Sequence, residues 1–212
     1  MLHKTIRCAS MLAALASFAH AGDRTFFALY PLQYSSTSLV SNQDGNKTGS
    51  FNSSWVGLMG GGVADGWLAE TDMSGLVAAL MDPDKSDGGI MSVRLGHNII
   101  SGDVSVGAAA VLDFHSMNRI KMDGWSGLGG LVYSKFNVGN LHFLPKVAYV
   151  VAGTESDHNA NIYNIISMEC GVGMQLGGGF AITAQPSYDI RSLPEKGSAN
   201  RFMVRLGVAA VQ

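Results

Sequence analysis

Two short motifs in the sequence carry residue types that hydrolytic enzymes use. Asp113 and His115 stand two positions apart at the end of the run VGAAAVLDFHSM, and Asp82 and Asp84 stand two positions apart in MDPDKSDGG. Residues at positions i and i+2 of a β-strand point to the same side of the sheet. A histidine beside a carboxylate has the chemistry of a general base. The elements that carry these motifs decide what the motifs can do.

The segment that carries Asp113 alternates between apolar and small or polar residues. In DVSVGAAAVLDFH every second residue is apolar from Val104 to Phe114, and Asp113 and His115 belong to the opposite set. The same period of two runs through GFAITAQPSYDIR and RFMVRLGVAAV. Such alternation over about ten residues is typical of the strands of a transmembrane β-barrel.

Short glycine turns and longer polar connections follow one another along the chain. The pattern predicts strand pairs over 88–100 with 102–116, 124–138 with 140–153, and 162–176 with 179–190, joined by SGD, VGN and GGG. Between these pairs lie MNRIKMD, TESDHNAN and SLPEKGSAN, which we expect to be outer loops opposite periplasmic turns. Counting back predicts about ten strands. Eight is the alternative, because ADGWLAETDMSGLVAALM alternates poorly and part of it would suit a helix or a plug.

The N-terminus has the organisation of a secretory signal peptide. Lys4 and Arg7 precede the apolar run CASMLAALASFA, and Ala19-His20-Ala21 follows as a cleavage site of the A-x-A type. The apolar run is shorter than the roughly 20 residues that a membrane-spanning helix needs. We therefore expect a cleaved signal peptide over 1–21 and one outer-membrane barrel domain over 22–212. An uncleaved anchor is the alternative.

The composition narrows the function classes further. Charged residues make up 14% of the chain, compared with about 25% in ordinary soluble domains. The net charge of −2 gives no reason to expect a nucleic-acid partner. Cys170 is the single cysteine after the signal peptide, so no internal disulfide, metal site or cofactor is expected. A secreted β-sandwich or lipocalin-like barrel is the soluble alternative, but the small residues of the polar faces suit a crowded barrel interior better.

In pattern, residues 24–212 resemble the small OmpA/OmpX-type outer-membrane β-barrels of Gram-negative bacteria. The final strand, RLGVAAVQ, places Arg205 and Gly207 where that class has the polar residue and glycine of its assembly signal. It ends in Gln212, where the class usually ends in Phe or Trp. The resemblance implies an all-β, antiparallel up-and-down transmembrane β-barrel. It also implies outer-membrane lipids, lipopolysaccharide and the barrel-assembly machinery as partners, and it identifies no protein partner beyond these.

Two enzymatic resemblances concern the rim of the expected barrel. An Asp-x-Asp together with an Asp-x-His is similar to the omptin proteases, which implies Asp113 and His115 as a general-base pair and Asp82 and Asp84 as opposing acids. The chain is shorter than the omptins and shows no other omptin motif. His115-Ser116 is similar to the pair used by lipid A deacylases, although adjacent strand residues face opposite ways. A rim hydrolase therefore stays an alternative, and the sequence favours a protein that is not an enzyme.

Charged residues on the polar faces of the strands are expected inside the barrel. They are Arg94, Lys146, Glu169, Gln185, Asp189 and Arg205, the glutamine included as a polar neighbour. Charges of both signs inside a narrow barrel lower their free energy by pairing, because an unpaired buried charge is very costly. The sequence thus predicts a filled lumen and a structural or interaction role at the cell envelope. A narrow porin-like channel for small solutes is the alternative.

Overall fold

The chain forms ten β-strands in the part that the structure describes. The computed structural model describes residues 25–41, 46–64, 66–73, 87–117, 122–156, 159–177, 179–193 and 197–211. The strands are β1 (Thr25–Val40), β2 (Lys47–Ala64), β3 (Trp67–Asp72), β4 (Asp87–Ile100), β5 (Val104–Met117), β6 (Met122–Val138), β7 (Leu141–Ser156), β8 (Asn159–Gly177), β9 (Phe180–Leu193) and β10 (Gly197–Val211). The expected signal peptide over 1–21 and the pair Asp82 and Asp84 lie outside the described residues. No described helix is long and apolar enough to cross a membrane.

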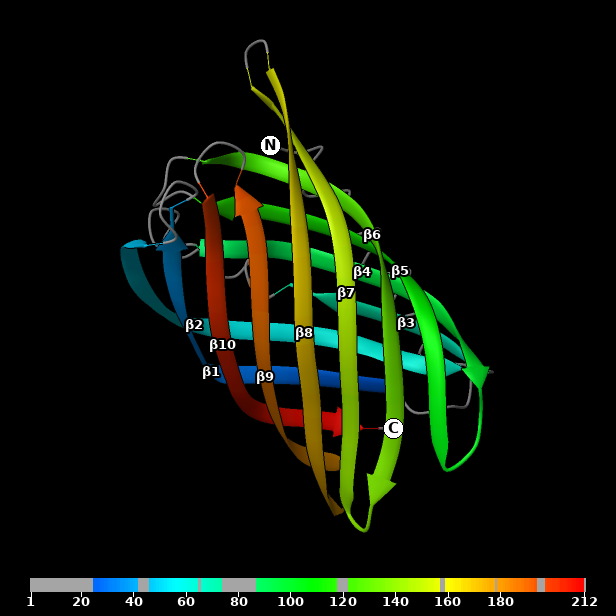
Figure 1. Ribbon diagram of the computed structural model, residues 1–212. Coiled ribbons are helices and arrows are strands. Elements are labelled where there is room, and N and C mark those ends of the chain that lie inside the picture. Colours follow the sequence, from blue (N-terminus) through cyan, green and yellow to red (C-terminus); the bar gives the residue numbers. More distant parts are fainter. Residues whose placement is uncertain are drawn as a thin grey trace, which may run out of the picture.

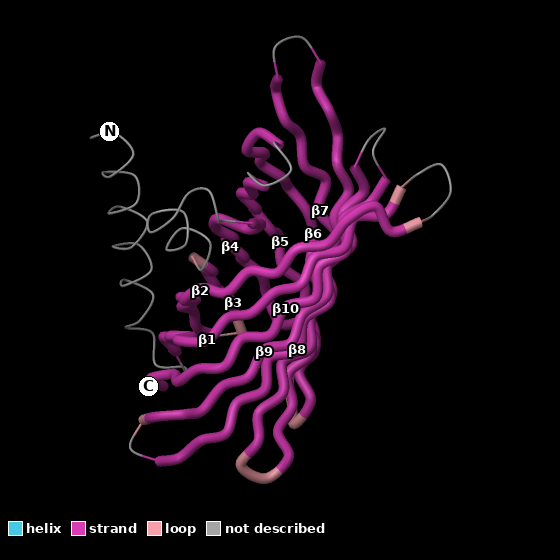
Figure 2. The backbone as a smooth tube through the Cα atoms, turned by 90° about the vertical axis from the view of Figure 1, so that its left-hand side faces the viewer, coloured by secondary structure: helices cyan, strands magenta, loops and turns pink. Residues whose placement is uncertain are grey.

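The strands close into one antiparallel barrel. Each strand pairs with its neighbours in the sequence, and β1 pairs with β10 from Phe26↔Val211 to Val40↔Ser198 (Figures 1 and 2). Closure gives the edge strands partners, which a barrel in lipid requires. The prediction of an all-β, up-and-down barrel of ten strands is confirmed, and the eight-strand alternative is wrong.

Two ends of the barrel differ in their connections. At one end, which we call the short-turn end, β2–β3, β4–β5, β6–β7 and β8–β9 meet in tight turns. Gly139 in the β6–β7 turn has φ 59°, a backbone conformation that glycine adopts without the steric penalty of a Cβ. The opposite end, the loop end, carries the remaining connections. One of them is that of the β7–β8 hairpin, which projects at the top of Figure 1.

The strands at the loop end run further than their apolar alternation predicts. Much of TESDHNAN, expected to be a loop, belongs to β7 and β8, which pair up to Ser156↔Asn159. β6 pairs with β7 only as far as Gly153, and β8 leaves β9 at Ile165, so the tip is a free-standing hairpin (Figure 2). The expected loops MNRIKMD and SLPEKGSAN are shortened in the same way. Backbone hydrogen bonds between adjacent strands continue beyond the part of the hairpin that faces lipid.

The outer surface is apolar and the inner surface is not. Large apolar side chains are exposed on the wall, among them Leu95, Val104, Leu112, Leu128, Val132, Val147, Ile182, Leu206 and Val208. On β5 the inward set is buried, with Ala109 at 7% and Val111 at 1% exposure. The predicted inside and outside faces of β5, β9 and β10 are therefore confirmed. An apolar exterior of this kind suits the hydrocarbon core of a membrane.

The sector around β3 differs from the rest of the wall. β3 has six residues, and it pairs with β2 over Met59–Ala64 and with β4 over Ser92–His97. Its alternation is poor because Leu68 faces inward along with Glu70, so an apolar side chain interrupts the polar face. Among the described residues, β3 is the one strand between β2 and β4, and its pairing with both neighbours ends at Asp72.

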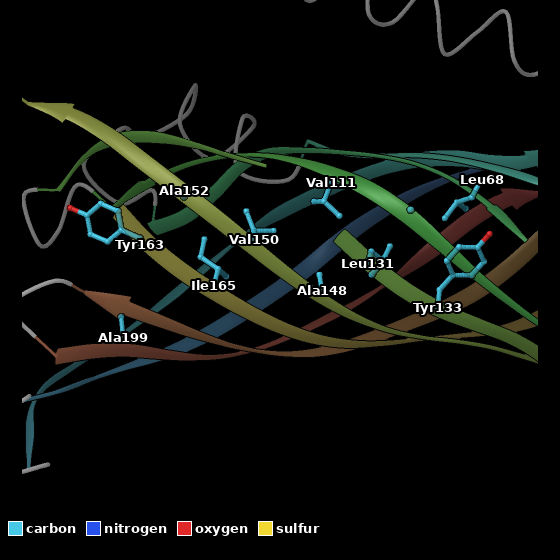
Figure 3. Packing of buried hydrophobic residues seen from close by; sticks show 11 residues of the cluster. Leu68, Val111, Leu131, Tyr133, Ala148, Val150, Ala152, Tyr163, Ile165 and Ala199 are labelled. Atoms are coloured by element: carbon cyan, nitrogen blue, oxygen red, sulfur yellow. The ribbon is translucent and has the colours of Figure 1, made fainter. Parts of the chain in front are cut away.

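Apolar side chains also fill part of the interior. One cluster runs along the inside of β5–β8 and includes Val111, Leu131, Tyr133, Val150 and Ile165, whose side chains lie along the barrel from Ile165 to Tyr133 in Figure 3. Gly107 lies directly opposite Tyr133, and a Cβ added at Gly107 would come within 2.2 Å of the Tyr133 ring. The phenol of Tyr133 donates a hydrogen bond to Asn98 Oδ1 at 2.7 Å. Small and large residues thus alternate around the interior to fill it.

Candidate functional site: the ionic interior

Four charged side chains meet near the middle of the barrel. Glu70 of β3, Arg94 of β4, Lys146 of β7 and Glu169 of β8 form what we call the four-residue ionic cluster. In the closed strand order β3 and β8 are five steps apart in either direction, so they lie on opposite walls. Because Arg94 and Lys146 each bind both glutamates, the cluster crosses the lumen from one wall to the other.

Lys146 uses all of its hydrogen-bonding capacity in this cluster. Its Nζ donates to Glu70 Oε2 at 2.7 Å, to Glu70 Oε1 at 2.8 Å and to Glu169 Oε1 at 2.8 Å. An ammonium has three donors, and all three are occupied. The side chains of Lys146 and Glu70 are 2% and 0% exposed. Full pairing of this kind is what a buried charge needs.

The guanidinium of Arg94 also binds the carboxylates of Glu70 and Glu169. Its Nη1 donates to Glu70 Oε1 at 2.5 Å, and its Nη1 and Nη2 donate to the two oxygens of Glu169 at 3.2 Å each. The contact with Glu169 is bidentate, a geometry that the planar guanidinium favours. Two cations and two anions therefore make a neutral group, which lowers the free-energy cost of burying it.

A second cluster lies closer to the loop end. Asp189 of β9 binds Arg201, its register partner on β10, and also Arg191 at 3.2 Å. Ser167 of β8 donates to Asp189 Oδ1 at 2.7 Å. We call these four residues the Asp189 cluster. It leaves Nε and Nη1 of Arg191 without a hydrogen-bond partner among the described residues, although Arg191 is only 1% exposed.

A further pair connects β3 with β10. Arg205 Nη1 binds Asp72 Oδ2 at 2.6 Å and donates to Gln185 Oε1 at 3.4 Å. The guanidinium of Arg205 also lies 5.9 Å from the ring centroid of Tyr30, within the range of a cation–π contact. Arg205, which the sequence pattern relates to an assembly signal, has its charge directed into the interior.

Every residue that the sequence analysis expects inside the barrel lies in this ionic interior. Glu70, Asp72, Arg191 and Arg201 belong to it as well and were not predicted as members. Arg201 is the first residue of RFMVRLGVAAV and has the same parity as Arg205, so the alternation of that segment already places it on the polar face. Glu70 and Asp72 carry no such signal, because β3 is short and interrupted by Leu68. The two acidic residues of β3 were therefore the hardest members of the interior to predict.

Asp113 belongs with the lumen charges. It is half-buried and lines a cavity of about 60 Å³ together with Arg94, Asp189 and Arg201. Its carboxylate has an attractive interaction with the guanidinium groups of Arg94 and Arg191. The backbone of His115 pairs with Gly89 and Trp125 in the wall, and its side chain lies outside the described residues. Asp113 thus shares a lumen cavity with buried arginines, a position that neither rim-hydrolase resemblance assigns to it.

The described residues contain no group of three or more His, Cys, Asp or Glu side chains that could hold a metal ion. Cys170 has a free thiol on β8 and is half-buried. It shares its face with Ile166 and Met168, both more than 40% exposed. The position is that of a small apolar residue on the outer wall.

A closed ten-stranded antiparallel barrel that is apolar outside and ionic inside has the architecture of a small outer-membrane β-barrel protein. No protein-family model and no curated protein matches the sequence. Solved structures of similar fold include Ail, the attachment invasion locus protein of Yersinia pestis, at 10% identity and TM-score 0.37, covering 88% of this chain and 98% of that one. Neisserial surface protein A matches at 8% identity and TM-score 0.40, covering 87% and 96%. The translocator domain of the autotransporter NalP from Neisseria meningitidis matches at 13% identity and TM-score 0.42, covering 98% and 95%.

Proposed function

We propose that this protein is a non-conducting outer-membrane β-barrel with a structural or interaction role at the cell envelope. The observation that carries the proposal is the four-residue ionic cluster, which joins Glu70 on one wall to Glu169 on the opposite wall. A barrel of eight to ten strands is mostly filled by its own side chains, and here the filling is ionic.

The energetics of the cluster favour a plug over a pore. An ion that passed this level would have to separate Arg94 and Lys146 from the two carboxylates. Breaking a buried ion pair costs about 3–5 kcal/mol, since it leaves an uncompensated charge in a low-dielectric interior. The Asp189 cluster and the apolar cluster of Figure 3 occupy further parts of the lumen.

The outside of the barrel supports the envelope location. The exposed apolar side chains of the wall suit contact with lipid, including the lipid chains of lipopolysaccharide. The last strand, with Arg205 and Gly207 on its inner face, is the segment that the assembly machinery would bind. The projecting β7–β8 hairpin gives the protein a surface beyond the membrane for an interaction partner.

Location is tested by membrane fractionation and by gel mobility with and without boiling. We expect the protein in the outer-membrane fraction, beginning at Gly22 after removal of the signal peptide, with a mobility that changes on heating. Recovery in the soluble periplasmic fraction, with one mobility before and after boiling, would contradict an outer-membrane barrel.

Conductance tests the plug itself. The refolded protein in a planar lipid bilayer should show no steady ion current, because the four-residue ionic cluster closes the lumen. Folded insertion is verified on the same preparation by its heat-modifiable mobility. Regular single-channel steps would contradict the plug and support the narrow channel for small solutes instead.

A further inference from the structure

A second cavity, larger than the one beside Asp113, lies inside the barrel near the short-turn end. Its volume is about 190 Å³, and we call it the chamber. Its apolar walls are formed by Ala28, Tyr30, Met59, Leu68, Ala181 and Ala209. Each of these side chains is at most 5% exposed. The chamber is therefore an interior space with well-ordered apolar walls, distinct from the ionic cavity on the other side of the clusters.

The chamber is closed at its inner end by residues of the ionic interior. Lys146 and Gln185 line its inner side, and both belong to the ionic interior. The three donors of Lys146 are already bound to carboxylates, so the floor offers a ligand no free charge. The ring of Tyr30, which is part of the chamber wall, has its centroid 5.9 Å from the guanidinium carbon of Arg205. A ligand can fill the chamber without passing through the barrel.

The mouth of the chamber is polar and carries basic side chains. Asn98, Lys135, His142 and Gln175 line it, each within three residues of the strand end at a short turn. Asp103, the acidic residue of the β4–β5 turn, is exposed and lies outside the lining. The lining therefore changes from apolar at depth to basic at the entrance.

We propose that the chamber binds a single-chain anionic amphiphile, with its hydrocarbon chain in the apolar space and its carboxylate at the Lys135 ammonium, beside His142, whose Nδ1 lies 2.7 Å from Asn137 Oδ1. An engineered apolar cavity of about 150 Å³ is large enough to bind benzene, so this chamber has room for a short hydrocarbon chain. The proposal goes beyond the envelope role and does not depend on it, since binding here needs neither conductance nor a protein partner.

The depth of the chamber limits the chain length. From His142 to Lys146 on β7 the strand advances about 13 Å at roughly 3.3 Å per residue. The strand tilt of a barrel reduces this to about 10 Å along its axis. The site therefore suits a fatty acid of medium length, such as octanoate, and is too shallow for the whole chain of palmitate.

Equilibrium dialysis of labelled octanoate against the full-length mature protein in lipid nanodiscs tests the site, with empty nanodiscs as background. We expect saturable binding, tighter than that of hexanoate and no weaker than that of palmitate. Octylammonium should bind about tenfold more weakly, because its charge is repelled at the mouth. Equal binding of octanoate to empty nanodiscs, or equal affinity for octylammonium, would overturn the proposal.

Two matched variants locate the ligand. Ala209→Leu fills the chamber and should weaken octanoate binding at least about tenfold. Ala210→Leu places the same side chain on the exposed face of the same strand and should leave binding unchanged. If Ala209→Leu does not refold, Ala28→Leu makes the same test from β1. Unchanged binding in the folded chamber variant would overturn the assignment.

Discussion

The filled middle of the lumen and the chamber near the short turns use glycine in opposite ways. In the filled part, a Cβ added at Gly129 would lie 2.1 Å from the Tyr149 carbonyl oxygen. In the chamber wall, a Cβ at Gly171 would make its nearest contact at 3.6 Å, with Leu144 Cβ, and one at Gly173 at 3.9 Å. Glycine permits close packing at Gly129 and leaves open space at Gly171 and Gly173.

One barrel interior can therefore contain both a closed ionic region and an open apolar cavity. The four-residue ionic cluster closes the lumen with two cations and two anions that pair with one another. The chamber is kept open by small residues whose neighbours do not reach across. We therefore expect the stability of the barrel to respond in opposite directions when a methyl group is added in the two regions.

The largest effect is expected from Glu70→Ala in the filled region. It leaves Arg94 and Lys146 with Glu169 as their shared carboxylate, so the free energy of unfolding should fall by about 3–5 kcal/mol. Urea unfolding of the refolded barrel in lipid vesicles measures the change. Asp103→Asn, on an exposed turn, is the control and should have little effect. Equal values for the two variants would show that the cluster does not stabilise the fold.

Gly129→Ala is expected to have the next largest effect. The added methyl group meets backbone atoms of β7, which cannot move without disturbing the sheet, so we expect a loss of about 1–3 kcal/mol in the free energy of unfolding. Gly130→Ala on the same strand is the control, because nothing lies within 4 Å of its added Cβ. The same urea titration compares the two, and the interpretation fails if Gly130→Ala is the more destabilising.

The smallest effect, and of opposite sign, is expected from Gly171→Ala in the chamber wall. The added methyl group has ordinary contacts, and alanine restricts the unfolded chain more than glycine does, so the barrel should gain about 0.4–1 kcal/mol. A slower unfolding rate in vesicles at a fixed urea concentration is the measurement. A loss as large as that of Gly129→Ala would mean that the chamber is as tightly packed as the rest of the lumen.

The sequence predicted the long strands because their faces are chemically distinct along the whole length. On β9, Gln185 and Asp189 alternate with apolar residues over the full strand, and both are buried in the structure as that pattern requires. β3 was the least clearly predicted strand, since six residues with Leu68 on the inner face give too few repeats to show a period of two. The extended tips of β7 and β8 were missed for a related reason, because polar hairpins outside lipid have no apolar face to alternate.

The candidate rim site shows where a local motif misleads. Asp113-x-His115 has the spacing of a pair on one strand face, and the structure places Asp113 on the inner face of β5. The neighbours that give Asp113 its role, Arg94 and Arg191, lie far away in the sequence. No motif of three residues contains that information.

The sequence by itself determined which residues face the interior and where the chain turns, because a strand's period of two and a glycine turn are local properties. Only the tertiary structure decided which interior residues meet. Glu70 and Glu169 are held by the same two cations because closure of ten strands puts β3 and β8 on opposite walls. The strand number and stagger of the closed barrel set that distance across the lumen, and they also set the space that remains as the chamber.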